Sequence, residues 1–177
     1  MKQLLYLALA LGMVACGDKS EVPANQLAGN DFESMDGWLG DTGMGSLTKD
    51  KAHSGRYAIK VDAKNEYSIG YGNMLGKLSA SKLKKVKIRA WVNLPDANSK
   101  AVLVTQIANP TDPSKPLMWD GFKLTDKVKT YNKWVEVERE IALPENVTYA
   151  DKLGVYLWRA STSAVTYLDD LSIEKVD

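Results

Sequence analysis

Asp169 has the most distinctive chemical setting in the sequence. It lies near the end of the chain, in the segment AVTYLDDLSIE. Val165, Tyr167, Leu171 and Ile173 alternate with polar or small residues, which is the period-two pattern of a strand with one buried face. Asp169 falls on that apolar face, where a carboxylate is costly unless it is paired or holds a cation. Two interpretations stay open from these residues: Asp169 caps a loop at the strand end, or it belongs to a structural calcium site.

The single cysteine, Cys16, and the single histidine, His53, exclude several kinds of site. His/Cys zinc clusters and intramolecular disulfides need more of these residues than the chain has. A hydrolytic triad would have His53 as its only base, and no Ser/Asp partner pattern accompanies it. We therefore expect His53 to be a surface residue in a turn beside Gly55.

Three glutamates, Glu136, Glu138 and Glu140, share one face of a predicted strand that begins at Trp134. Glycosidases need two carboxylates that flank the sugar, so this set is the best catalytic candidate. Charged alternation is also typical of a solvated strand face, and the spaced acidic motif of a sandwich laminarinase is absent. We expect the protein not to be an enzyme.

The composition limits the classes of partner that the protein is expected to bind. The 177 residues are enough for one domain with its own core, and the formal net charge is +1. The chain has no excess of basic residues, so its charge does not indicate nucleic acid or anionic lipid as a partner. Five Trp and eight Tyr stand against two Phe. Trp and Tyr combine an apolar face with a polar group, which suits an amphipathic ligand as well as a core.

The start of the chain predicts a targeting signal. Residues 1–3 are positively charged, and residues 4–14 form an apolar run too short to span a bilayer as a stable helix. The run ends in MVACG, which resembles a bacterial lipobox, although Met13 stands where Leu is usual. In such a signal Cys16 is lipidated and becomes the first mature residue. The alternative is an ordinary signal peptide with an unrelated Cys.

This interpretation divides the chain into a lipoprotein signal peptide over residues 1–15, a lipidated Cys and polar tether over 16–26, and a domain over 27–177. The lipid would attach the protein stably to a membrane, so we expect it in the cell envelope, at the outer membrane or the cell surface. The membrane contact would be through the lipid anchor only. Envelope proteins are possible partners.

After the signal, the sequence predicts short strands separated by turns and no convincing helix. The clearest strand covers residues 85–94: Val86, Ile88, Ala90 and Val92 form one face, and polar residues and Trp91 form the other. Shorter strand patterns lie at 30–33, 46–50, 57–61, 66–72, 101–107, 122–124, 134–141, 153–159 and 164–174. This spacing predicts an antiparallel β-sandwich or barrel.

A series of landmarks runs along the domain in a fixed order. They are NDFE with Trp38, then AHSGRYAIKV, VKIRAWV, WVEV, LGVYL and finally YLDDLSI. In this order they resemble the jelly-roll carbohydrate-binding modules of the group spanning families 4, 9 and 22, which have a galactose-binding-like β-sandwich. The resemblance covers residues 27–177 and implies an all-β, antiparallel jelly roll. It specifies the fold better than the ligand, since the same fold also serves for spacing and adhesion.

The resemblance also implies a structural Ca²⁺ near the first and last strands. The acidic positions match Glu33 and Asp169, and the loop before Gly55 would add backbone carbonyls from Lys51 and Ser54. Carboxylate and carbonyl oxygens are the ligands that a hard cation needs. Asp170 either contributes to the site or faces solvent. The ion would join two distant segments of the chain and do no chemistry.

Sugar rings stack their C–H faces on aromatic rings and pair their hydroxyls with polar side chains. The strand face with Arg89 and Trp91 is the best candidate for such a site. Further candidates are Tyr67, Tyr71, Gln106, Trp119 in a loop with nearby prolines, Tyr156 and Trp158. Each Trp has the alternative of a place in the core.

The function predicted from these residues is non-catalytic binding of a poly- or oligosaccharide by an envelope-anchored lipoprotein. The alternative is a structural or protein-interaction jelly-roll module of the cell envelope with no glycan ligand. An exposed aromatic strip flanked by Arg, Asn or Gln favours the first function, and a flat apolar patch favours the second.

Overall fold

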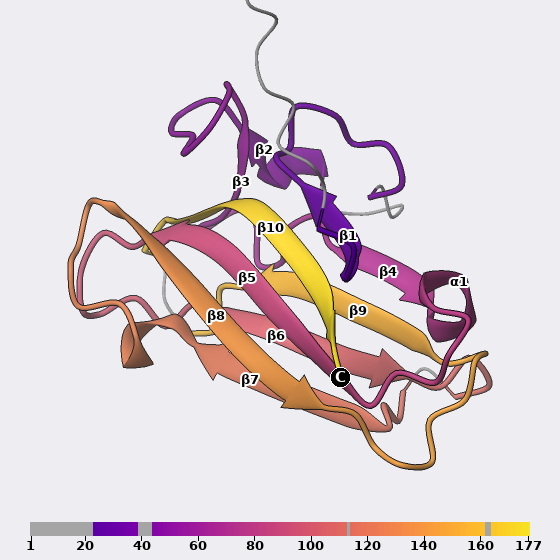
Figure 1. The fold of residues 1–177 in the computed structure, drawn as a ribbon. Coiled ribbons are helices and arrows are strands. Elements are labelled where there is room, and N and C mark those ends of the chain that lie inside the picture. The colour runs from indigo at the N-terminus through magenta and orange to yellow at the C-terminus, as the bar shows by residue number, and fades with distance from the viewer. Residues whose placement is uncertain (1–22, 39–43, 113, 162–163) are drawn as a thin grey trace, which may run out of the picture.

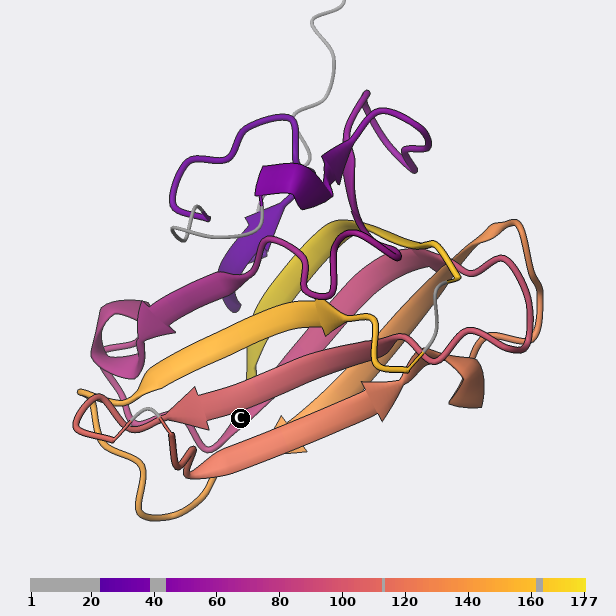
Figure 2. The same ribbon diagram turned by 180° about the vertical axis from the view of Figure 1, so that it is seen from behind.

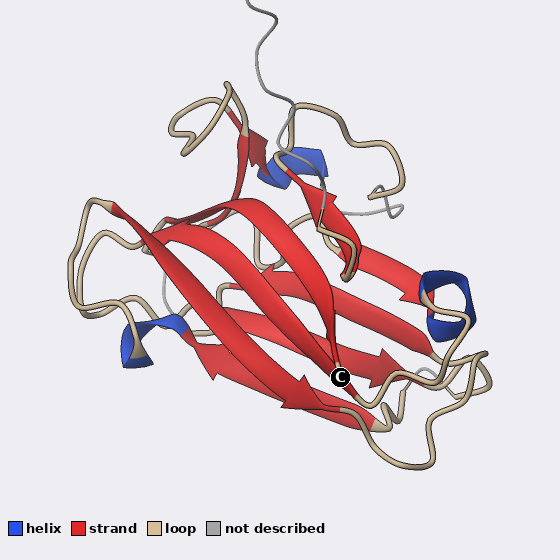
Figure 3. Cartoon of the chain, viewed as in Figure 1, coloured by secondary structure: helices blue, strands red, loops and turns tan. Residues whose placement is uncertain are grey.

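The structure is a computed structural model that describes residues 23–38, 44–112, 114–161 and 164–177. These residues form two β-sheets packed face to face, with very little helix (Figures 1 and 3). The strands are β1 (Gln26–Asn30), β2 (Leu47–Thr48), β3 (Ala58–Val61), β4 (Tyr71–Met74), β5 (Lys85–Asn93), β6 (Val102–Ala108), β7 (Met118–Lys123), β8 (Trp134–Ala142), β9 (Lys152–Trp158) and β10 (Thr166–Val176). The helical elements among these residues are η1 (Met44–Ser46), α1 (Leu75–Leu78) and η2 (Leu124–Asp126).

All named strands pair antiparallel. The larger sheet has the order β2-β3-β10-β5-β8, and β1 also pairs with β10. Because β10 is long, β3 pairs with its first part and β1 with its second part, opposite the edge that pairs with β5. The smaller sheet has the order β4-β9-β6-β7, and Figure 2 shows it from its outer side. The predicted antiparallel β-sandwich with a jelly roll is confirmed.

The core lies between the two sheets and follows from strand alternation. In β5, Val86, Ile88, Ala90 and Val92 are fully buried, as their period-two pattern predicts. They meet the inward face of the smaller sheet, whose Leu153, Val155 and Leu157 on β9 are equally buried. Truncating one such aliphatic side chain to Ala costs about 2–5 kcal/mol.

The last strand differs from its predicted pattern. Tyr167 and Asp169 pair with Asn93 and Trp91 on the outer face of the larger sheet, whereas Ile173 pairs with the inward-facing Ile88. The register shifts between Asp169 and Ser172, and Asp170 has a φ of 47°. This bulge adds a residue and reverses the alternation, so the prediction that Asp169 shares the face of Leu171 and Ile173 is wrong. Asp169 is nevertheless fully buried, because the loop around His53 covers it.

Other boundaries also move. The first strand is Gln26–Asn30 instead of 30–33, because Phe32 has a φ of 59° and lies in the turn after it. In the segment predicted as a strand over 66–72, Tyr67 makes only an isolated bridge and β4 begins at Tyr71. Trp119, predicted in a loop, lies inside β7. The prediction of no helix misses the single turn of α1.

The predicted signal peptide, Cys16 and most of the tether lie outside the described residues. Within the part of the chain that the structure describes, we find no helix with the length and apolar character needed to cross a bilayer.

Candidate functional site

The outer face of the smaller sheet carries the candidate site. In β9, Leu153, Val155 and Leu157 point into the core, so Lys152, Gly154, Tyr156 and Trp158 face outward. β9 lies between β4 and β6, so its outward side chains occupy the middle of this face. The alternation of a single strand therefore sets a Lys, a Gly and two aromatics along one line.

Cross-strand pairing places residues of β4, β6 and β7 in rows with the outward residues of β9. Gly154 lies opposite Gly72 on β4 and Gln106 on β6, and Gln106 lies opposite Trp119 on β7. In the next row, Tyr156 lies opposite Val104, and Val104 lies opposite Gly121. Directly opposed residues share a face, so aromatic, amide and glycine positions gather on the outside of the smaller sheet.

An aromatic cluster occupies one end of this face, and we call Tyr67, Trp119, Tyr156 and Trp158 the aromatic end. Tyr67 and Trp158 have nearly parallel rings with centroids 6.4 Å apart. Trp119 meets Trp158 edge to face at 6.3 Å, and Tyr67 meets Tyr156 at 5.9 Å. Tyr67 is 51% exposed and Trp119 is 49% exposed, so the cluster presents ring surface to solvent. Aromatic rings that are exposed together, in contact with one another, are a feature of binding surfaces.

Polar contacts fix two of these rings. Trp158 donates its Nε1–H to Glu66 at 3.3 Å, and the Tyr156 hydroxyl donates to Gln106 Oε1 at 3.4 Å. Burial raises the pKa of the Tyr67 hydroxyl, and the Glu66 carboxylate adds to the increase. Burial also raises the pKa of the Tyr71 hydroxyl. Both hydroxyls are therefore protonated at neutral pH and can donate hydrogen bonds.

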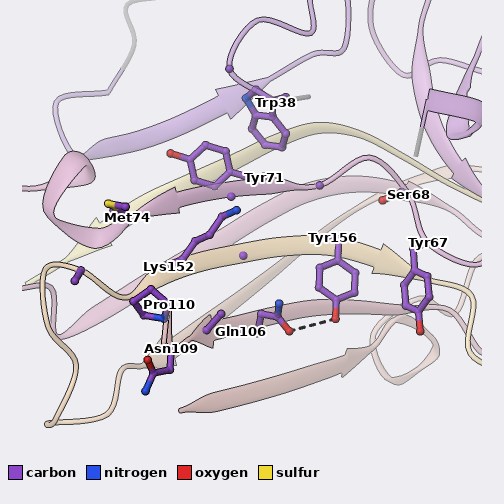
Figure 4. A pocket seen from close by; sticks show the side chains of 16 residues that line it. Trp38, Tyr67, Ser68, Tyr71, Met74, Gln106, Asn109, Pro110, Lys152 and Tyr156 are labelled. Atoms are coloured by element: carbon purple, nitrogen blue, oxygen red, sulfur yellow. Dashed lines mark hydrogen bonds between the residues drawn. The ribbon is translucent and has the colours of Figure 1, made fainter. Parts of the chain in front are cut away.

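Next to the aromatic end, the face is hollowed into a groove of about 650 Å³ (Figure 4). Its lining includes Tyr67, Tyr71, Gly72, Gln106, Lys152 and Tyr156. Glycines give it depth: a Cβ on Gly154 would lie 3.2 Å from Gln106 Cγ, and one on Gly70 would lie 2.9 Å from the Val155 carbonyl oxygen. A side chain at Gly154 would stand against Gln106 on the floor of the groove, and one at Gly70 would collide with the backbone of β9.

The structure brings together most of the predicted ligand residues. Tyr67, Tyr71 and Gln106 line the groove, and Trp119 and Trp158 stand at its aromatic end. The sequence reasoning missed Lys152, Asn109 and the glycines of the floor. The signal for Lys152 was its period-two spacing from Tyr156 and Trp158.

The structure does not bring Arg89 and Trp91 to this groove. Both lie on β5, on the outer face of the larger sheet. Arg89 forms ion pairs with Glu136, Glu138 and Glu174, at 3.5–3.9 Å. One face of Trp91 is stacked on His53, with ring centroids 3.9 Å apart. His53 is exposed, as predicted.

The residues predicted to bind calcium lie in or against the loop 51–57. Asp169 Oδ2 accepts the backbone N–H groups of His53 at 2.7 Å and Ser54 at 3.2 Å, and Oδ1 accepts the N–H of Asp170. Asp170 itself bonds the His53 ring at 2.5 Å and the Ser54 hydroxyl at 2.6 Å. Burial raises the pKa of Asp169 to about 6, against the opposing effect of the N–H donors.

The other two predicted ligands lie at the rim of this loop. Glu33 Oε1 accepts the backbone N–H groups of Arg56 and Tyr57, which lower the pKa of its carboxyl. The Lys51 side chain instead reaches Asn93 Oδ1, at 3.5 Å.

In the structure, the carboxylates predicted to bind Ca²⁺ are bonded by groups of the protein itself. Among the residues that the structure describes, no three His, Cys, Asp or Glu side chains are grouped so as to hold a metal. Backbone N–H groups bond Asp169 through both carboxylate oxygens and Glu33 through Oε1, so a Ca²⁺ would share these oxygens with the N–H donors. Calcium stays a prediction.

Comparison with known proteins bears on the fold. No protein-family model and no curated protein matches the sequence. Among solved structures, the CBM22-2 xylan-binding domain from Paenibacillus barcinonensis matches with a TM-score of 0.57 at 19% identity, over 85% of this chain and 99% of that one. The CBM22-1 domain of the same protein matches with a TM-score of 0.53 at 21% identity, over 86% and 95% of the two chains.

A third match is the CBM22-1-GH10 structure of Clostridium thermocellum endo-1,4-beta-D-xylanase 10B complexed with xylohexaose. Its TM-score is 0.54 at 14% identity, over 86% of this chain and 29% of that one. At such identities the likeness concerns the fold alone. The chain therefore has the jelly-roll β-sandwich fold of family 22 carbohydrate-binding modules.

Proposed function

We propose that this protein binds a carbohydrate chain, without catalysis, along the groove on the smaller sheet. The observation that carries the proposal is the aromatic end, where half-exposed Tyr67 and Trp119 stand around Trp158 beside a glycine-floored groove. The fold supports it, because the similar solved structures are named as xylan-binding domains and one is a complex with xylohexaose. A polysaccharide, whose linked rings offer both C–H faces and hydroxyls, is the kind of ligand that such a surface fits.

Each group has a role that follows from its chemistry. Trp119 and Trp158 offer ring faces to the C–H faces of sugars, which removes apolar surface from water. Gln106 and the Tyr156 hydroxyl already bond each other, so they are held in place to exchange hydrogen bonds with sugar hydroxyls. The absence of a side chain at Gly154 leaves depth for a chain between the strands and the rim, whereas the stem of Lys152 lies over Gly72.

The proposal needs no bond-making step. The catalytic candidates Glu136, Glu138 and Glu140 lie on β8 in the larger sheet, away from the groove. Arg89 pairs with the first two, and Lys85 and Lys87 pair with Glu140. Paired surface charges of this kind are typical of a solvated sheet face.

We also propose that the chain is attached to the cell envelope through a lipid on Cys16. The motif MVACG after an apolar run is the support for this part. Metabolic labelling with a radioactive fatty acid tests it: label is expected in the native chain and absent from Cys16→Ser. Label in both chains, or in neither, would refute the anchor and leave the binding proposal intact.

Affinity electrophoresis of residues 23–177, which hold the whole described sandwich, tests binding itself. The gels contain a panel of soluble neutral and acidic polysaccharides. We expect retardation by at least one polysaccharide, and loss of retardation in Trp119→Ala. A folded domain that migrates unchanged through every gel would overturn the proposal and favour the protein-interaction function.

A further inference from the structure

Lys152 lies inside the groove. It is the first residue of β9, its side chain is exposed, and it lines the groove beside Gly72. A Cβ on Gly72 would lie 2.6 Å from Lys152 Cε and 3.1 Å from its Nζ. The stem of the lysine therefore reaches the bare backbone of β4, and Figure 4 shows the Lys152 side chain extending from β9 towards that strand.

The charge of Lys152 is not balanced nearby. The described residues that line the groove include no Asp, Glu or Arg, so Lys152 is their one charged side chain. No carboxylate of the described residues lies within ion-pair distance of its Nζ. By contrast, several cations elsewhere on the two sheets are paired, such as Lys60 with Asp50 at 2.7 Å and Arg139 with Asp120 at 3.0 Å. Lys152 therefore gives the groove a positive charge that no carboxylate of its lining offsets.

The position of Lys152 separates it from the aromatic end. Along β9, Lys152 and Trp158 are six residues apart, which is roughly 20 Å at the rise of a β-strand. A bound chain can stack neutral rings at Trp158 while a substituent several rings away reaches Lys152. The two contacts are thus separable by mutation.

We propose that the ligand of this groove is an acidic polysaccharide, and that Lys152 selects it by pairing with an anionic group on the sugar. The inference rests on the proposed function, and it adds the chemical class of the ligand and the residue that reads it. A uronic acid carboxylate and a sulfate ester carry the same charge, and both suit an ammonium group. The C–H faces of the sugar rings would supply stacking, and the anionic group would supply the preference for the acidic polysaccharide over its neutral form.

The test compares each acidic polysaccharide with its neutral form. Isothermal titration uses glucuronoxylan, polygalacturonate and alginate, each native and after reduction of its carboxyl groups to alcohols. A sulfated xylan and plain xylan form a further pair. We expect tighter binding of the acidic member in at least one pair, by about 3- to 10-fold at low salt, and a smaller difference at high salt. The pair that shows the difference identifies the anion as carboxylate or sulfate.

Variants test whether Lys152 causes the preference for the acidic polysaccharide. Lys152→Met is expected to abolish the difference between the two members of a pair while it leaves binding of the neutral member unchanged. Lys152→Arg is expected to keep the difference, and Lys133→Met, an exposed lysine at the other sheet, serves as the matched control. Equal binding of acidic and neutral members by the native domain, or a difference that survives Lys152→Met, would overturn the inference and leave the proposed function standing. Absence of binding to every member would overturn both.

Discussion

Tyr67 and Trp158 lie opposite each other across an isolated antiparallel bridge, with ring planes only 9° apart. The bridge joins the segment before β4 to the end of β9, so two parts of the chain 91 positions apart hold one aromatic surface. Trp119 from β7 completes it edge to face. Three separate segments of the sandwich therefore converge on the surface that we assign to carbohydrate.

The depth of the groove depends on Gly154. Gly154→Val would place a branched side chain against Gln106, because a Cβ there already lies 3.2 Å from Gln106 Cγ. We expect glycan binding to be lost while the fold is kept, since Val is favoured in strands. Titration of the variant with the best polysaccharide checks this, with Ala142→Val on the larger sheet as the control. Undiminished binding by a folded Gly154→Val domain would mean that the ligand does not enter this groove.

The buried carboxyl of Asp169 predicts an unusual pH dependence in the presence of a chelator. Its pKa is about 6 in the fold against an ordinary value of 3.8, so the folded state holds this proton more tightly than the unfolded state. Its protonation therefore adds to the free energy of unfolding at pH 4, and this contribution is lost as the pH rises through 6. The whole contribution is at most about 3 kcal/mol.

Denaturant unfolding of the native domain and Asp169→Asn at several pH values checks this expectation. The asparagine cannot titrate, so its free energy of unfolding, relative to the native domain, should increase from pH 4 to pH 6. Comparing the two proteins removes the opposite contribution of Glu33, Asp50 and Asp62, whose carboxyl pKa values are lowered in the fold. A constant difference between the two proteins over this range would contradict the assignment.

Calcium binding, if it occurs at the loop 51–57, would reverse that trend. A bound Ca²⁺ keeps Asp169 ionised, so stability would then increase with pH from 4 to 6. At a free calcium concentration about 100 times the dissociation constant, the stabilisation would be about 2.7 kcal/mol.

Thermal melts with calcium, with magnesium and with chelator test the site. We expect a higher melting temperature with calcium, lost in Asp169→Asn and kept in Asp112→Asn, a change on an exposed loop. Identical melts with calcium and with chelator would remove calcium from the account, and the N–H contacts of Asp169 would then be its only partners.

Strand periodicity explains why most of the fold was predictable. The alternation in 85–93 separates an inward from an outward face whatever the partner strand is, and the structure confirms it. The reversal in β10 was not predictable in this way, because it comes from a bulge at Asp170 with a positive φ, which Asp adopts without any change in the hydrophobic pattern.

The same limit explains the outcome for the site. Periodicity indicates that Trp91 and Trp158 face away from their own core neighbours, but it does not indicate which sheet each strand joins. β5 joins the larger sheet, where His53 stacks on Trp91, and β9 joins the smaller one, where Trp158 borders the groove. Lys152 was missed because its period-two spacing from Tyr156 and Trp158 gives its face but does not show that Gly72 lies beside it.

The two tryptophans provide the most direct test, because they lie on opposite sheets. Calorimetric titration with the polysaccharide that retards the domain most strongly compares native protein, Trp158→Ala and Trp91→Ala, each first shown to be folded by its melt. The account predicts that Trp158→Ala raises the dissociation constant about tenfold or more, which is a loss of at least about 1.4 kcal/mol, while Trp91→Ala leaves it unchanged. Loss of binding in Trp91→Ala with full binding in Trp158→Ala would place the ligand on the larger sheet and contradict the account.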